Sequence, residues 1–304
     1  MPFPIKGPPP HIRSEGTATR LRSQDDPPDS DFTIGQALAL GALHGPAELL
    51  PISSSGHIAL IPWLLDWDYV RLDAELRKSF EVVLHAGTAA ALLIMLRGEV
   101  DEALRGMNFR LATLVTLSFA PPALIGYRCE RQIERYLGTP PTIAAGLIGG
   151  AIVMAWADRS PQTRRSAQAR AVDALCLGLA QSCALIPGVS RNGATLAAAR
   201  LRRFTREDAN RLSRHVALPV IAGATVLKCV RLAQHGLPPH TAVPFVAGAA
   251  ASFGSTLGST WLIRQVERDR SLLPYAAYRV GLGLAVAWRL YRQRPRAGAP
   301  EGSA

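Results

Sequence analysis

Cysteine is scarce in this chain, and the few cysteines form no recognisable site. The 304 residues include four cysteines, none of them in a CxxC pair, so we expect neither a disulfide framework nor a metal cluster built on them. No apolar stretch precedes residue 33, so we expect no signal peptide. The net charge is +11, but basic residues interleaved with exposed aromatics, which favour nucleic-acid binding, are missing. We therefore predict no nucleic-acid partner.

Apolar segments of membrane-spanning length recur instead, and 48% of the residues are hydrophobic. A helix needs about 20 apolar residues to cross the hydrocarbon core. We predict an all-α polytopic membrane protein with about six full spans, at 79–96, 111–126, 141–157, 211–230, 241–263 and 273–291. Residues 32–291 then form the membrane domain. The Pro-rich residues 1–31 are predicted to be a disordered tail, or an over-long start, and 292–304 a C-terminal tail.

Two further apolar regions, 33–65 and 171–201, do not fit a simple span. In each, an apolar run is broken by Pro and Gly, followed by polar residues and a second short apolar run. Non-helical backbone at membrane depth is tolerated only where protein or a wet cavity surrounds it. We therefore predict two re-entrant helical hairpins.

The two hairpin sequences also resemble each other, which predicts an internal repeat. "ALALGALHGPAELLPISSSGH" (37–57) aligns with "ALCLGLAQSCALIPGVSRNG" (174–193) with one gap, so the repeat halves are about 33–157 and 171–291. The loops 97–110, 158–170, 200–214 and 264–272 carry 16 Lys and Arg, against 7 in 66–78, 127–140 and 231–240. The positive-inside rule makes the first set cytoplasmic. The hairpins then enter from opposite faces, as in an inverted-topology repeat with a site at the midplane.

Ionisable residues inside membrane segments are costly and usually functional. Here they are His44, Glu48, His57, Glu81, His85 and Arg191, and the pairs His44/Glu48 and Glu81/His85 are each spaced to share a helix face. Ser53, Ser54, Ser55, Ser190 and Asn192 accompany them, and Gly188 and Gly193 let backbone N–H groups approach a guest. Such N–H groups beside an arginine form an anion site, particularly for phosphate. The alternative, polar residues that only join helices, fits this many groups less well.

At these residues the sequence resembles a known family. "ELLPISSSGH" (48–57) and "PGVSRNGAT" (187–195) are similar to the two signature motifs of the integral-membrane undecaprenyl-pyrophosphate phosphatases, the bacitracin-resistance type. "FEVV" at 80–83 and "PYAAYR" at 274–279 also fit, in the expected order. The resemblance implies hydrolysis of undecaprenyl diphosphate to the monophosphate and phosphate, which recycles the lipid carrier of the cell wall and gives bacitracin tolerance. It also implies a multi-pass protein of the bacterial cytoplasmic membrane with its site facing outward.

The same resemblance implies roles for individual residues. Ser54 corresponds to the proposed nucleophile, His57 to its neighbouring histidine and Glu48 to the metal or acid–base glutamate. Our hypothesis from these roles is that Ser54 attacks the terminal phosphorus while His57 removes its proton. Arg191, with Ser190 beside it, corresponds to the arginine that grips phosphate. The remaining substrate-binding candidates are Gly188, Asn192, Gly193, Ser53 and Ser55, and His44, Glu81 and His85 are accessory candidates. A divalent cation, Mg²⁺ or Ca²⁺, is implied as cofactor, and a homodimer is one assembly left open.

The sequence departs from the family pattern at three positions. His44 stands where Glu or Gln is usual, His85 where Gln is frequent, and Asn192 where a second Ser is usual. His44 and His85 could bind metal, relay a proton or only pair. A histidine nucleophile or direct attack by water is equally compatible with the residues. A lipid-carrier flippase or small-anion transporter would use the same arginine and turns, and a degenerate lipid-phosphate binder is a third reading.

Overall fold

The computed structural model describes residues 32–235, 241–267 and 271–293, and this part of the chain is helical. The helices are α1 (Ile34–Leu49), α2 (Ser54–Leu64), η1 (Asp68–Arg71), α3 (Ala74–Met95), α4 (Arg97–Arg105), α5 (Phe109–Leu137), α6 (Pro140–Asp158), η2 (Ser166–Gln168), α7 (Ala171–Cys183), α8 (Arg191–Leu201), α9 (Arg206–His235), α10 (Ala242–Gly258), α11 (Thr260–Glu267) and α12 (Leu273–Gln293). The all-α prediction is confirmed for these residues. Both predicted tails, except 292–293, lie outside them.

Three of the described helices are long and apolar enough to cross a membrane, namely α3, α6 and the Phe109–Cys129 part of α5. α6 shows why they suit lipid better than water. Its Ile152, Val153 and Trp156 are 61%, 46% and 64% exposed, while Met154 on the same helix is fully buried. Apolar side chains on the outside as well as the inside are typical of a membrane helix. The predicted total of about six spans stays a prediction.

The predicted span 241–263 consists of two helices, and its crossing of the membrane stays a prediction. α10 ends at Gly258, and α11 begins at Thr260. The Ser259 N–H binds the carbonyls of Ser255 and Thr256, and the Thr260 hydroxyl donates to the Leu257 carbonyl. The bond to Thr256 is of the i→i−3 type that is common at a helix end, so α10 ends at Gly258 and the helix is interrupted at Ser259.

Both regions that were predicted as hairpins consist of two helices joined by a tight turn. α1 and α2 flank residues 50–53, and α7 and α8 flank residues 184–190. Each turn contains a backbone in the left-handed region, at Ser53 (φ 78°) and Gly188 (φ 93°), which allows the sharp reversal. The helix–turn–helix form is thus as expected. That the hairpins are re-entrant stays a prediction.

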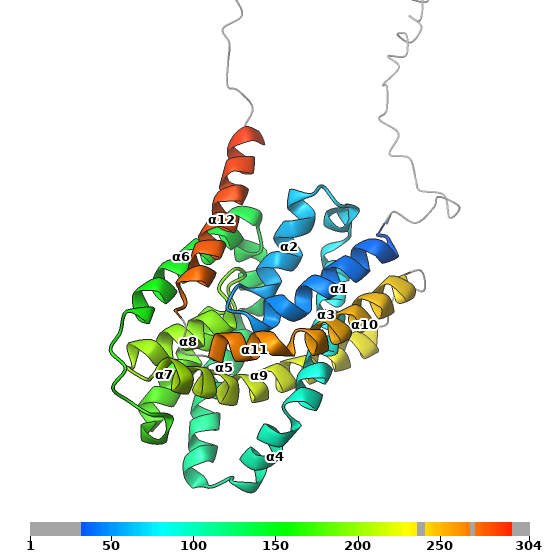
Figure 1. Ribbon diagram of the computed structural model, residues 1–304. Coiled ribbons are helices and arrows are strands. Elements are labelled where there is room, and N and C mark those ends of the chain that lie inside the picture. Colours follow the sequence, from blue (N-terminus) through cyan, green and yellow to red (C-terminus); the bar gives the residue numbers. More distant parts are fainter. Residues whose placement is uncertain (1–31, 236–240, 268–270, 294–304) are drawn as a thin grey trace, which may run out of the picture.

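Helices of one predicted half pack against helices of the other half. α1 lies along α10, α7 lies along α5, and α6 pairs with α12 (Figure 1). The α1–α10 contact depends on Gly41 and Gly45, because a Cβ on either would lie 2.3 Å from the Gly248 carbonyl oxygen or 2.4 Å from Ser255 Oγ. Small residues four apart are what closely packed membrane helices need. This packing between the halves is compatible with the predicted repeat. The repeat and the bounds of its halves stay a prediction.

The four loops predicted to be cytoplasmic lie together. Arg110 donates to the Ala167 carbonyl at 2.6 Å, and Arg214 lies 3.5 Å from Glu99. Asp158 receives hydrogen bonds from Arg206 at 2.8 Å and Ser271 at 2.7 Å. At the other end of the molecule Arg289 of α12 pairs with Asp66. The loops therefore share one face, and their assignment to the cytoplasm stays a prediction.

Candidate functional site

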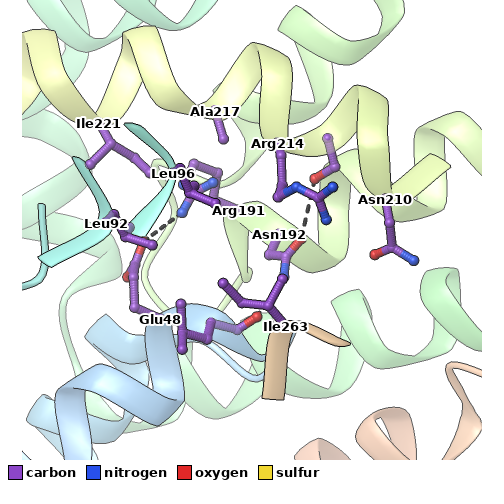
Figure 2. A pocket seen from close by; sticks show the side chains of 12 residues that line it. Glu48, Leu92, Leu96, Arg191, Asn192, Asn210, Arg214, Ala217, Ile221 and Ile263 are labelled. Atoms are coloured by element: carbon purple, nitrogen blue, oxygen red, sulfur yellow. Dashed lines mark hydrogen bonds and ion pairs between the residues drawn. The ribbon is translucent and has the colours of Figure 1, made fainter. Parts of the chain in front are cut away.

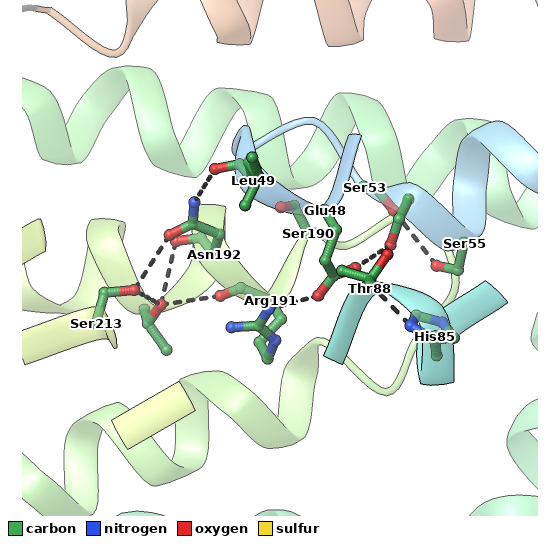
Figure 3. Close-up of polar contacts among 12 residues, drawn as sticks. Glu48, Leu49, Ser53, Ser55, His85, Thr88, Ser190, Arg191, Asn192 and Ser213 are labelled. Carbon is green, nitrogen blue, oxygen red and sulfur yellow. Dashed lines mark hydrogen bonds and ion pairs between the residues drawn. The ribbon is translucent and has the colours of Figure 1, made fainter. Parts of the chain in front are cut away.

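The two turns, far apart in the sequence, meet inside the molecule. A Cβ on Gly56, at the start of α2, would lie 3.5 Å from the Gly188 Cα. The Asn192 side chain, at the start of α8, donates to the Leu49 carbonyl at 3.0 Å. Figure 3 shows residues from both turns around one centre. The sequence motifs therefore build a single site, as predicted.

Glu48 is the centre of that site. Its Oε2 accepts a hydrogen bond of 2.5 Å from the Ser54 hydroxyl, and its Oε1 accepts one of 2.5 Å from the Arg191 guanidinium. The Glu48 and Arg191 side chains are only 10% and 20% exposed, so water screens the ion pair weakly. One carboxylate thus holds both the candidate nucleophile and the candidate phosphate-binding arginine, and Figures 2 and 3 show its contact with the arginine.

Two helix N-termini face this centre. Ser53 caps α2 by accepting from the Gly56 N–H at 3.3 Å, and Ser190 caps α8 by accepting from the Gly193 N–H at 3.1 Å. The first turn of a helix carries unsatisfied N–H groups and a partial positive charge. Two such termini beside a guanidinium favour an anion with several oxygens, such as a phosphate.

His57 lies in the site but not beside Ser54. Its Nδ1 is 2.7 Å from the Ser53 carbonyl oxygen, which can only accept, so Nδ1 carries the proton. Its Nε2 then accepts from the Tyr278 hydroxyl at 2.8 Å, and the two rings stack with centroids 5.6 Å apart. Both nitrogens are engaged by groups other than Ser54. The Ser54 hydroxyl donates to Glu48 instead, so the expected Ser54–His57 pairing is not what the fold brings together.

Cavities adjoin the site on two sides. One, of about 60 Å³, is lined by Glu48, Arg191 and Asn192 together with Asn210 and Arg214 (Figure 2). Another, of about 230 Å³, is lined by Ser55, Arg77, Lys78 and Glu81, among other residues. The second cavity is bounded by the end of the turn at 53–55 and by the 66–78 loop region, which is the predicted outer side.

Comparison with known proteins identifies the family. The family described as "Bacitracin resistance protein BacA" matches residues 37–285. The chain belongs to this family. It is 39% identical over 272 residues to the undecaprenyl-diphosphatase of Geobacter sulfurreducens, covering 85% of this chain and 98% of that protein. It is also 30% identical over 277 residues to the undecaprenyl-diphosphatase of Salinibacter ruber, covering 85% and 100%.

Most of the predicted site residues lie around Glu48. The turns contribute Ser53, Ser54, Ser55, Gly188, Ser190, Arg191, Asn192 and Gly193. His85 Nδ1 lies 4.0 Å from Glu48 Oε2, and the His44 ring stands edge-on to the His85 ring at 4.5 Å between centroids. Glu81, one turn before His85, lines the outer cavity with Arg77 and Lys78.

Two functional candidates were not assigned from the sequence. Tyr278 holds His57, and Arg279 is 1% exposed and donates to the Gly188 carbonyl at 3.1 Å and towards the Gly146 carbonyl at 3.4 Å. Arg279 therefore fixes the turn that presents Arg191. Both residues end the segment "PYAAYR" (274–279), so the motif was the signal, but its contact with the turns is tertiary.

Three side chains of the described residues are grouped closely enough to hold a metal ion. His44, Glu48 and His85 each offer a ligand atom, and these atoms lie within 4.8 Å of one another. The set contains two imidazoles and one carboxylate. Mg²⁺ and Ca²⁺ prefer oxygen ligands, so these residues fit the expected hard cation poorly. We derive no catalytic step through such an ion.

Proposed function

We propose that this chain hydrolyses undecaprenyl diphosphate to undecaprenyl phosphate and inorganic phosphate, as a membrane-bound phosphatase. The relatives named undecaprenyl-diphosphatase match it over almost their whole length. The observation that carries the proposal is the bridge made by Glu48, which binds a serine hydroxyl through one oxygen and an arginine through the other. This arrangement places a nucleophile, a proton acceptor and a phosphate-binding group in contact.

The diphosphate binds at the two helix N-termini. Arg191 has five N–H donors and uses only some of them on Glu48, so the others can face a phosphate oxygen. The first-turn N–H groups of α2 and α8 add donors that are already in position. Phosphoryl transfer depends mainly on such positioning and neutralisation of charge.

Ser54 then attacks the terminal phosphorus. Its hydroxyl proton passes to Glu48, to which it is already hydrogen bonded, while the bond to the bridging oxygen breaks and undecaprenyl phosphate leaves, taking that proton from Glu48 onto its phosphate oxygen. Water hydrolyses the phosphoserine, with Glu48 taking a proton from that water and the Ser54 oxygen regaining one. His57 supports this chemistry indirectly, because its Nδ1–H holds the carbonyl of Ser53.

The lipid substrate explains why the site lies between apolar helices. A polyprenyl chain stays in the bilayer, since each buried CH₂ contributes about 0.8 kcal/mol, so its headgroup has to be reached there. We place the protein in the cytoplasmic membrane with the site open to the outer side, where Arg77 and Lys78 line the larger cavity and attract the anion. Recycling of the cell-wall lipid carrier and bacitracin tolerance follow from this reaction. We also propose that the enzyme uses a divalent cation as its cofactor.

Phosphate release from undecaprenyl diphosphate by the purified chain in detergent tests the proposal. Ser54→Ala should lower the rate by at least about 1,000-fold, because it removes the nucleophile. Arg191→Ala should lower it to a similar extent, since it removes the phosphate contact and leaves Glu48 buried without its partner. Arg105→Ala is the matched control, because this arginine is exposed on α4 and pairs with Asp101 at the surface.

Near-normal phosphate release by Arg191→Ala would contradict the proposed site. Retained activity in Ser54→Ala with loss in Glu48→Gln would instead indicate direct attack by water. If the wild-type chain releases no phosphate, but transports a polyprenyl phosphate or a small anion in liposomes, the enzyme assignment itself is wrong.

A further inference from the structure

His44 is buried beside the catalytic centre with one ring nitrogen unused. The residue is 1% exposed. Its Nδ1 lies 2.9 Å from Thr88 Oγ1 and 3.3 Å from Ser252 Oγ. Its Nε2 is buried and has no hydrogen-bond partner among the described residues. Buried polar atoms are usually satisfied, so an unpaired imidazole nitrogen next to Glu48 needs an explanation.

The hydroxyl groups around His44 favour one position for its proton. Ser252 donates to the Leu84 carbonyl at 2.8 Å, and Thr256 donates to the Ser252 carbonyl at 2.7 Å. Thr88 Oγ1 lies 2.8 Å from Ser252 Oγ and 3.2 Å from Thr256 Oγ1. The arrangement with the most hydrogen bonds has Thr88 donating to one of these two oxygens and accepting from His44 Nδ1, because each hydroxyl has a single proton. In that arrangement the His44 proton is on Nδ1, and Nε2 presents a lone pair.

The neighbouring ligand atoms are within reach of the same ion. His85 Nδ1 lies 4.0 Å from Glu48 Oε2, while Arg191 binds the other oxygen, Oε1. Two metal–ligand bonds of about 2.1 Å bridge at most about 4.2 Å. The ligand atoms of His44, Glu48 and His85 lie within 4.8 Å of one another, so a small side-chain movement brings them onto one ion. The Glu48–Arg191 pair need not break.

We propose that His44, Glu48 and His85 bind a divalent first-row transition-metal ion, of the Mn²⁺ to Zn²⁺ series, in preference to Mg²⁺ or Ca²⁺. Imidazole nitrogens suit these borderline ions, whereas Mg²⁺ and Ca²⁺ select oxygen ligands. Thr88 completes the site as a positioning residue, because a ligand histidine is oriented by a hydrogen bond from its other nitrogen. The inference deepens the proposed function, on which its catalytic meaning rests, but metal binding is measured separately.

Competitive metal binding by the full chain in detergent tests this inference. The purified protein is stripped with chelator and dialysed against an excess of Mg²⁺ and Ca²⁺ with trace Zn²⁺, Mn²⁺ and Co²⁺, and bound metal is determined by mass spectrometry. We expect about one transition-metal ion per chain. The Co²⁺ form should show visible absorption bands typical of nitrogen coordination.

Variants of the ligands make the test specific. His44→Gln and His85→Gln should each weaken transition-metal binding by at least about 100-fold, and Thr88→Val by about 10- to 100-fold. His215→Gln is the matched control and should bind as the wild type does, because His215 of α9 is not part of the ligand group and lines another cavity with Glu99 and Arg211. Size-exclusion profiles establish that each variant is folded. Because two ligand histidines are replaced separately, the test still stands if one of the two variants does not fold.

Binding of Mg²⁺ or Ca²⁺ in place of the trace metals would overturn the inference, as would unchanged transition-metal binding in folded His44→Gln and His85→Gln. Phosphate release measured on the same preparations separates the two proposals. Release without transition-metal binding contradicts only the metal site. Metal binding without release from undecaprenyl diphosphate contradicts only the proposed function.

Discussion

At the scale of single residues, the site is defined by which hydrogen-bond acceptor each donor meets. Ser54 and Arg191 both donate to Glu48, whereas His57 donates to a backbone carbonyl and accepts from Tyr278. In the proposed reaction, His57 therefore positions the turn that carries Ser53 and Ser54, and Glu48 takes the Ser54 proton. The hypothesis drawn from the motif assigned the base to His57, the histidine that neighbours Ser54 in it.

Tyr278→Phe distinguishes these roles. The variant keeps the ring that stacks on His57 but removes its hydroxyl, so Nε2 loses its donor. If His57 is a positioning residue, the phosphate-release rate should fall by up to about 10-fold, which corresponds to one lost hydrogen bond, and the pH profile should keep its shape. If His57 is the base for Ser54, freeing Nε2 should leave the rate unchanged or raise it and shift the profile.

At the scale of the elements, tight turns hold the two helix N-termini against each other. Gly188 adopts φ 93°, and a Cβ there would lie 2.2 Å from the Ile143 carbonyl oxygen. Arg279 binds the carbonyl of the same residue. Position 188 therefore requires glycine, because its backbone has a positive φ and because a Cβ would clash with Ile143.

Gly188→Ala should destabilise the protein by at least about 2 kcal/mol and abolish phosphate release. Thermal unfolding in detergent measures the first effect. Gly149→Ala on α6 is the control, because nothing lies within 4 Å of its Cβ position, and a helical Gly→Ala change should if anything stabilise by about 0.5–1 kcal/mol. Equal stability of the two variants would contradict the role of the turn.

The start of α7 depends on a buried carboxylate. Asp173, 1% exposed, accepts from Arg164 at 2.7 Å and from Arg202 at 2.6 Å, and it caps the helix through the Arg170 N–H at 2.8 Å. Burial alone would raise the pKa of Asp173, but the hydrogen bonds from Arg164, Arg170 and Arg202 lower it to about 2. The stabilisation is therefore complete above the ordinary carboxyl pKa and is lost only as the pH falls towards 2.

Asp173→Asn should lower the free energy of unfolding by about 2–3 kcal/mol at neutral pH, because two guanidinium groups lose their charged acceptor. Asp101→Asn, which breaks the exposed Asp101–Arg105 pair on α4, should change it by less than about 1 kcal/mol. Unfolding temperatures of both variants, measured in the same detergent, provide the comparison. An equal loss of stability in the two variants would show that the buried ion pairs of Asp173 stabilise the protein no more than an exposed pair does.

At the scale of the whole molecule, the four arginine-rich loops gather at one face, and Arg289 joins α12 to Asp66 at the opposite end. Figure 1 shows this as the separation between α4 at one end and the C-terminal end of α12 at the other. By the positive-inside rule, this charge asymmetry predicts that the arginine-rich face is cytoplasmic.

Labelling of single cysteines by a membrane-impermeant thiol reagent tests this orientation. In a chain with all four native cysteines replaced, Arg71→Cys should be labelled in intact spheroplasts. Gln162→Cys, in the loop between α6 and α7, should be labelled only after the membrane is opened. The reverse pattern would invert the topology and place the larger cavity on the cytoplasmic side.

The sequence by itself determined the helical class, the family and the two motifs that meet at Glu48. This was achievable because apolar length, turn residues and signature motifs are local properties of the chain. Only the tertiary structure decided which partner each polar group takes. It paired the Ser54 hydroxyl with Glu48, Tyr278 with His57 and Thr88 with His44, and it ended α10 at Gly258. Hydrogen bonds between helices depend on packing across the whole fold, and no spacing along the chain encodes them directly.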